Sequence, residues 1–184
     1  MWKLIFAPLV LFLVMTEAAA QSGQSTDQTG WEEFAPEDGG FSILFPTKPV
    51  EAVQKKTNYT LHSFTSVAGR GTYVASYADY QQIKTEPAAF LTANRDRFIK
   101  SMQATLGSSR EITLNGHTGL EFTAEHPAAN IKSQIFLVGK RLFQTATMIF
   151  KDVDQTTYVN RFFESFRLTQ KAQETQKAQE PQIR

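Results

Sequence analysis

Two tight-turn signals in the second half of the chain constrain its fold more than any other feature. Asn115-Gly116 lies between two alternating runs of apolar and polar residues, which is the pattern of a hairpin with a type I′ turn. Gly139-Lys140 predicts a second hairpin, and residues 126–130 connect the two. The sequence therefore predicts a four-stranded antiparallel meander over residues 110–150. Its last run, 142–150, is apolar or threonine-rich on both faces and is expected to lie centrally.

The two turns also set which residues face each other across the strands. The expected pairs are Leu114 with His117, Arg110 with Glu121, Phe136 with Phe143, and Leu137 with Leu142. The pairing of Arg110 with Glu121 joins opposite charges and supports this register.

Strands are also predicted before the meander. Residues 41–45 form a short apolar run that ends at Pro46. Residues 58–67 and 72–81 are rich in β-branched and aromatic side chains, and Gly69-Arg70-Gly71 supplies the turn between them.

A first helix is predicted from Pro87 to Leu106, because apolar side chains recur there at three- and four-residue spacings. Thr85 or Glu86 is expected to cap its start, and Gly107 is expected to stop it.

A second helix is predicted to begin at a capping Asp154. Its apolar face holds Val159, Phe162, Phe163 and Phe166. Four large apolar groups require burial, so this helix is expected to pack on the sheet, with Arg161 and Glu164 pointing to solvent.

The first 20 residues have the three-part pattern of a secretory signal peptide. Lys3 gives a positive start, Leu4 to Met15 form an apolar run, and Ala18-Ala19-Ala20 precede the expected cleavage after Ala20. The apolar run is shorter than the roughly 20 residues that a membrane-spanning helix needs. We therefore predict a periplasmic or secreted chain with no membrane span after cleavage.

The rest of the chain divides into a linker, one domain and a tail. Residues 21–30 are polar and glycine-containing, as in flexible linkers, and 169–184 contain the hexapeptide TQKAQE twice in succession. Residues 31–168 between them are expected to form a single α+β domain, a mostly antiparallel sheet flanked by helices.

Composition excludes several classes of function. The chain has no cysteine, so it has no disulfide, thiol nucleophile or thiolate metal ligand. An exported domain without disulfides favours a bacterial origin. The net charge of +1 gives no general attraction for nucleic acid.

Three segments together resemble the PsbP-like family of exported bacterial proteins: residues 39–46, 138–144 and 161–168. The similarity extends over roughly 31–168 and rests on packing and turn features. It implies an α/β/α sandwich and an accessory or binding module more readily than an enzyme. The family's named plant members are extrinsic subunits of the photosynthetic oxygen-evolving complex, and none of their functional residues can be matched to this chain.

No catalytic, cofactor-binding or metal-binding residues are predicted. The chain lacks a G-x-S-x-G nucleophile elbow, and Gly107-Ser108-Ser109 is interpreted as a helix stop. His62, His117 and His126 lack the helical i, i+4 spacing of zincin sites, so surface polar roles are expected for them.

Two other groups of residues allow a functional interpretation beside a structural one. Glu121 and Glu125 share one strand face and could hold a cation, but their alternation with apolar residues predicts the wet side of an amphipathic strand. Tyr73, Tyr77 and Tyr80 with Trp31 could stack on a sugar or base, whereas aromatic residues in strands usually belong to the core.

The sequence thus predicts an exported, non-enzymatic accessory or binding module of the bacterial envelope, whose partner is an envelope or secreted protein. The alternative is a periplasmic carrier of a small apolar molecule or lipid, with a cavity between helix and sheet. A hydrolase is the third hypothesis.

Overall fold

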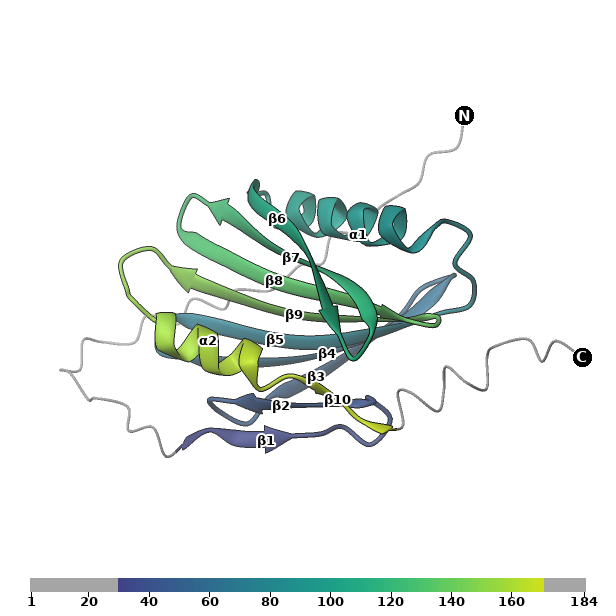
Figure 1. Ribbon diagram of the computed structural model, residues 1–184. Coiled ribbons are helices and arrows are strands. Elements are labelled where there is room, and N and C mark those ends of the chain that lie inside the picture. Colours follow the sequence, from purple (N-terminus) through teal and green to yellow (C-terminus); the bar gives the residue numbers. More distant parts are fainter. Residues whose placement is uncertain (1–29, 171–184) are drawn as a thin grey trace, which may run out of the picture.

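The computed structural model describes residues 30–170 (Figure 1). The signal peptide, the linker before Gly30 and the repeated hexapeptide beyond Gln170 lie outside the described residues, so their assignments remain predictions.

Seven antiparallel strands form the main sheet, in the order β3-β4-β5-β9-β8-β7-β6. Their bounds are β3 Val50–Lys55, β4 Tyr59–Ala68, β5 Gly71–Tyr80, β6 Thr105–Leu114, β7 His117–His126, β8 Ala129–Val138 and β9 Arg141–Phe150. The predicted meander is the β6–β9 half of this sheet, and β9 occupies its fourth and central place.

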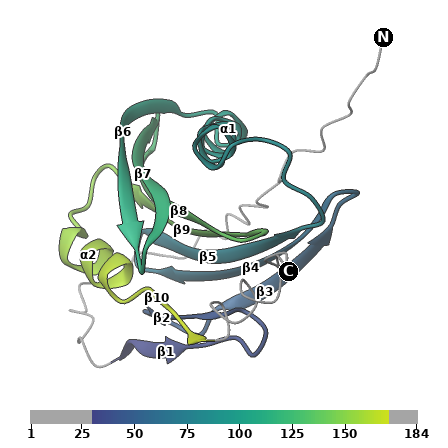
Figure 2. The ribbon, with the colours of Figure 1, turned by 45° about the vertical axis from the view of Figure 1, so that its right-hand side comes forward.

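A small sheet and two helices complete the domain. The small sheet has the order β1-β2-β10, with β1 Glu32–Phe34, β2 Phe41–Phe45 and β10 Arg167–Leu168. Helix α1, Pro87–Ser101, covers one face of the main sheet over β6–β8, and helix α2, Thr156–Glu164, lies with the small sheet on the opposite face (Figures 1 and 2). The predicted α+β class is confirmed, with one outer layer made partly of strands.

Both predicted hairpin turns and all four predicted pairs are confirmed. Asn115 and Gly116 have positive φ angles of 51° and 82°, as a type I′ turn requires. Leu114 pairs with His117 and Arg110 with Glu121 across β6 and β7. Phe136 with Phe143 and Leu137 with Leu142 pair across β8 and β9.

The sheet has a separate apolar core on each face. The core on the α2 face includes rings from both sheets and from the segment around α2, among them Phe41, Phe45, Tyr73, Phe143, Phe162 and Phe166. The core on the α1 face is mostly aliphatic and includes Leu91, Ile99, Leu120, Phe122, Ile131 and Ile135.

The predicted end of the first helix is wrong. Helix α1 ends at Ser101, and Gln103 then adopts a left-handed φ of 51°. Residues from Thr105 belong to β6, and the register shifts between Leu106 and Ser108. Gly107 is therefore the position of a β-bulge and not a helix stop, because pairing with β7 overrides the helical spacing that extends to Leu106.

Of the two predicted helix caps, only Asp154 makes a capping hydrogen bond. Glu86 occupies the N-cap of α1 without a side-chain hydrogen bond. The N-cap of α2 is Gln155, one residue after the predicted Asp154. Asp154 nevertheless stabilises the first turn, because its Oδ1 accepts hydrogen bonds from the backbone N–H and the hydroxyl of Thr156, at 2.9 and 2.7 Å.

No helix among residues 30–170 is long and apolar enough to span a membrane.

Candidate functional site

The three histidines do not come together in one site. The ring of His62 stacks on Tyr77 with 4.6 Å between centroids, and its Nδ1 lies 3.1 Å from a carboxylate oxygen of Glu51. His126 Nδ1 accepts the backbone N–H of Ala128 at 3.2 Å, while His117 begins β7 beside the hairpin turn. Within residues 30–170 there is no group of three or more acidic, histidine or cysteine side chains that could hold a metal ion.

The tyrosines considered for a stacking surface belong to the core. Tyr73 is fully buried, and its hydroxyl donates a 2.7 Å hydrogen bond to Gln155 Oε1. Burial, with a smaller effect of Tyr158, raises the pKa of Tyr73 to about 12. Tyr77 is also buried, and the hydroxyl of half-buried Tyr80 donates to Asn94 Oδ1 at 3.3 Å. The stacking hypothesis is therefore wrong for Tyr73 and Tyr77.

Glu121 and Glu125 do not act as a pair of carboxylates. The Glu125 side chain is 69% exposed and lies 3.6 Å from Lys151 Nζ, as expected on the wet side of a strand. The Glu121 side chain is only 13% exposed, because polar side chains of the two neighbouring strands surround it. The prediction of a solvated position thus fails for Glu121.

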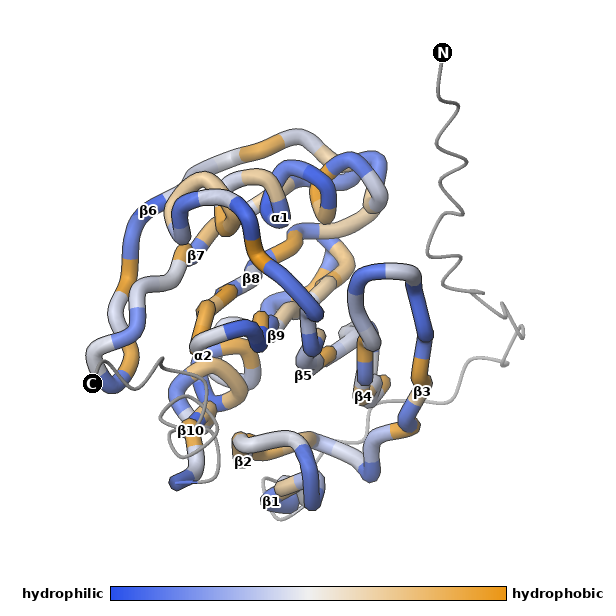
Figure 3. Tube along the Cα trace, turned by 90° about the vertical axis from the view of Figure 1, so that its right-hand side faces the viewer, coloured by the Kyte–Doolittle hydropathy of each residue, from blue (hydrophilic) through white to orange (hydrophobic). Residues whose placement is uncertain are grey.

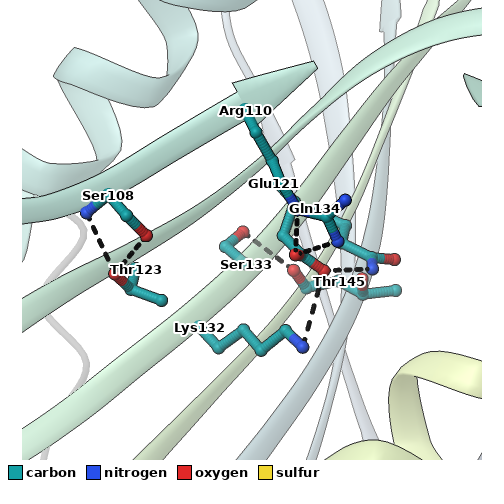
Figure 4. A network of polar contacts seen from close by, with 8 residues as sticks. All are labelled: Ser108, Arg110, Glu121, Thr123, Lys132, Ser133, Gln134 and Thr145. Atoms are coloured by element: carbon teal, nitrogen blue, oxygen red, sulfur yellow. Dashed lines mark hydrogen bonds and ion pairs between the residues drawn. The ribbon is translucent and has the colours of Figure 1, made fainter. Parts of the chain in front are cut away.

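Glu121 is the centre of a polar network on the α2 face of the sheet (Figure 4). Arg110 on β6 donates to Oε1 through Nε at 2.8 Å and through a terminal nitrogen at 2.5 Å. On β8, Gln134 donates to Oε2 at 2.8 Å, and Lys132 Nζ lies 3.5 Å from the same oxygen. All three groups hold the carboxylate in its ionised form.

The network sets the pKa of Glu121. Burial acts to raise this pKa, but the hydrogen bonds from Gln134 and Arg110 and the charge of Lys132 outweigh burial, so the pKa is lowered. A carboxyl group held ionised in this way is a poor general acid or base near neutral pH.

A groove of about 400 Å³ passes over this network, between α2 and strands β6–β8. Figure 2 shows the β6–β7 hairpin running down beside α2. Residues of the hairpin and of α2 line the groove. The apolar lining includes Phe136, Phe163 and Phe166, and the charged lining comprises Arg110, Lys132, Arg167, Glu121 and Glu164. A second hollow of about 560 Å³ continues over the outer side of α2 and shares Asn160, Glu164 and Arg167 with the groove.

The comparisons with known proteins identify the fold that carries this groove. No family model and no curated protein matches the chain by sequence. Its structure is similar to the solution structure of cyanobacterial PsbP (CyanoP) from Synechocystis sp. PCC 6803, with a TM-score of 0.58 over 80% of this chain and 98% of that chain. The chain has a PsbP-like fold. Because the two sequences are only 11% identical, this similarity shows the architecture alone. It confirms, for the fold, the resemblance inferred from the sequence.

The register of β6–β9 in this chain places four polar residues in one row across neighbouring strands, namely Arg110, Glu121, Gln134 and Thr145. We call these residues the polar row. Thr145 is 1% exposed, and its hydroxyl has no hydrogen-bond partner within the described part of the chain. Only the first pair was predicted from the sequence, because a connection over residues 126–130 was expected. The structure turns at residues 127–128 and pairs His126 with Ala129, which places Gln134 opposite Glu121.

Proposed function

We propose that this protein is a non-catalytic binding module, exported to the bacterial envelope, which holds an acidic segment of a partner protein in the groove beside α2. The observation that carries the proposal is the excess of positive charge around that groove. Arg110, Lys132 and Arg167 line it against Glu121 and Glu164. The adjoining hollow adds Arg161 and no further carboxylate.

The cations remain accessible to a partner even though they make contacts within the chain. The Arg110 side chain is 70% exposed, although two of its nitrogens reach Glu121. Lys132 lies 5.0 Å from the centre of the Phe163 ring and is 29% exposed. Arg167 donates to the backbone oxygens of Glu164 and Phe166, which fixes its guanidinium at the edge of the groove. Cations held in this way are preorganised, so an incoming carboxylate meets them with little further ordering.

The same geometry gives less support to the two alternatives. A carrier of an apolar molecule requires an enclosed cavity with few polar groups, whereas both hollows are open and have charged linings. An enzyme requires a nucleophile with a base, or a titratable group poised near neutral pH. Of the two carboxyl groups that line the groove, Glu121 is instead committed to ion pairs with Arg110 and Lys132 and to a hydrogen bond from Gln134.

The export part of the proposal rests on the sequence of the first 20 residues and has its own test. The full chain with a C-terminal tag is expressed in a bacterial host, and the mature protein is analysed by mass spectrometry of the periplasmic fraction. We expect cleavage after Ala20, so that the mature chain begins at Gln21. A chain retained in the cytoplasm with Met1 in place would contradict export.

The groove is tested with two baits of equal charge in envelope extracts of the source organism. Lys132→Gln with Arg167→Gln removes two charges at the groove. Lys100→Gln with Lys140→Gln removes two exposed charges from α1 and from the β8–β9 turn. We expect the groove variant to lose its partner by about fivefold or more, while the control retains it. Equal loss from both baits would indicate nonspecific attraction, and equal retention would place the partner elsewhere.

A further inference from the structure

One edge strand of the main sheet has a self-complementary charge pattern, and its outer side has no partner strand within residues 30–170. Strand β3, Val50–Lys55, is the edge opposite β6, and within residues 30–170 it pairs only with β4 (Figure 3). Five of its six residues are exposed, with Val50 at 73% and Val53 at 48%. An exposed edge strand presents a row of backbone donors and acceptors to a further strand.

The hydrogen bonds to β4 determine which residues of β3 face the open edge. The N–H of Lys56 donates to the carbonyl of Tyr59 at 2.9 Å, and Ser63 Oγ donates to the carbonyl of Ala52 at 3.3 Å. Successive residues of a strand direct their backbone groups to opposite sides. The even-numbered residues therefore face β4, and the N–H and C=O groups of Glu51, Val53 and Lys55 face outward.

This alternation limits how a second copy of the strand could pair with the first. In an antiparallel pair, residues with outward backbone groups must face each other, so the two-fold axis passes through a residue and not between two residues. Positions 52, 53 and 54 lie nearest the middle of the three outward-facing residues. With the axis at Val53, Glu51 of each copy faces Lys55 of the other, and two opposite-charge pairs flank a pair of valines. With the axis at Ala52, Lys55 faces Pro49, which has no N–H to donate. With the axis at Gln54, Lys55 faces Val53 and Glu51 faces Thr57.

We propose that two copies of this chain associate through their β3 strands, antiparallel and with Val53 on the two-fold axis. The two seven-stranded sheets then form one continuous sheet. Lysines on an edge strand normally discourage pairing, but here each Lys55 meets a Glu51. The opposite edge is less suited to this role, because the bulge at Gly107 interrupts the regular pairing of β6.

A six-residue edge buries little area, so the association depends on protein concentration. Sedimentation equilibrium of the full exported chain is expected to show a monomer that converts to a dimer as concentration rises. A monomer at every concentration, up to the limit of solubility, would overturn the proposal.

The absence of cysteine from the chain allows the register to be read directly. Val53→Cys places two sulfurs opposite each other on the axis, at a Cα separation of about 5.5 Å that suits a disulfide. Ala52→Cys and Gln54→Cys are the matched controls, because in this register their nearest copies lie on the diagonal at about 7–8 Å. We expect oxidation to cross-link the Val53→Cys chain in preference to both controls. A preferred cross-link at position 52 or 54 would disprove this register, and equal cross-linking at all three would indicate random collision.

Exchange of the two charges separates pairing from a general loss of folding. Glu51→Lys and Lys55→Glu each place like charges opposite one another, and each is expected to weaken self-association about tenfold. An equal mixture of the two variants restores both opposite-charge pairs and is expected to form the mixed dimer. Circular dichroism checks that each variant is folded. Failure of the mixture to associate, or undiminished association of either single variant, would disprove the proposal.

Discussion

The two faces of the main sheet are closed in different ways. On the α2 face, a nine-residue helix and the small sheet cover a core that contains ten buried aromatic side chains. On the α1 face, a fifteen-residue helix alone covers a core in which Phe122 is the one buried ring. A helix of nine residues is unstable by itself in water, so α2 depends on its large side chains. The same short helix leaves strands β6–β8 partly uncovered, and that uncovered part forms the groove.

Truncation of one buried side chain on each face tests this difference most strongly. Phe162 is fully buried, and its ring lies 5.4 Å from those of Phe45 and Tyr73. We expect Phe162→Ala to lower the free energy of unfolding by about 4 kcal/mol and Leu91→Ala on the α1 face by about 3 kcal/mol. Urea denaturation measures both.

Thr157 is an exposed residue of α2, so Thr157→Ala is the control for that experiment. It is expected to change the free energy of unfolding by less than about 0.5 kcal/mol. If Leu91→Ala destabilised the chain more than Phe162→Ala, the α2 face would not depend on its large buried side chains more than the α1 face does.

The parts of the fold that depend on neighbours in sequence were predictable. The Asn115-Gly116 and Gly139-Lys140 turns determine the register of β6–β9, and the structure has the predicted pairs. Local patterns were insufficient where distant strands decide the outcome. Leu106 continues the spacing of α1 but lies in β6, since residues there pair with β7.

Short or weakly patterned strands escaped prediction for a related reason. Strands β1 and β10 have three and two residues, and β3 has no alternation of apolar and polar side chains. The groove was also beyond local reasoning, because its walls come from α2 and from strands that precede α2 by many residues; Phe136 of β8 and Asn160 of α2, for example, both line it. Only Arg110 and Glu121, paired by one hairpin, were assigned together from the sequence.

A glycine on the α2 face gives the next largest expected effect. A Cβ at Gly119 would lie 2.4 Å from the carbonyl oxygen of Ile135 and 2.5 Å from the ring of Phe136. The carbonyl belongs to the paired strand and cannot move alone, so Gly119→Ala is expected to destabilise the chain by about 2–3 kcal/mol. Phe136→Leu in the same chain relieves only the ring contact, and full rescue in urea denaturation would show that the backbone contact is unimportant. Gly30→Ala, which meets nothing closer than 3.8 Å, is the neutral control.

The polar network makes the stability of the α2 face depend on pH. The folded pKa of Glu121 is lowered from 4.5, so the folded chain binds fewer protons there than the unfolded chain. Its stabilising contribution is complete above that value and is lost as the pH falls through the folded pKa. We expect Glu121→Gln to lower the free energy of unfolding by about 1–2 kcal/mol at pH 7, and the difference from the unaltered chain to shrink below pH 4.5.

Two variants show whether the pH dependence of stability arises from the contacts of Glu121. Glu125→Gln, at the exposed carboxylate of the same strand, is expected to change stability by less than about 0.5 kcal/mol. Leu91→Ala, on the apolar α1 face, is expected to lose the same free energy at pH 7 and at pH 4. A difference between the unaltered chain and Glu121→Gln that stayed constant with pH would assign the effect to packing.

The smallest expected effect concerns Gln103, which follows the end of α1 and has a strained backbone conformation. Gln103 has a φ of 51°, a conformation that is unfavourable for a residue with a Cβ, and the N–H of Ala104 then donates to the carbonyl of Ile99 at 3.1 Å. Gln103→Gly is expected to raise the free energy of unfolding by about 0.5 kcal/mol, since relief of strain exceeds the added freedom of the unfolded chain. Asn115→Gly, at the same φ, is the matched comparison and is expected to gain less, because asparagine tolerates this conformation. A loss of stability in Gln103→Gly, measured by the urea midpoint, would mean that the glutamine side chain, and not the backbone turn alone, holds α1 against the sheet.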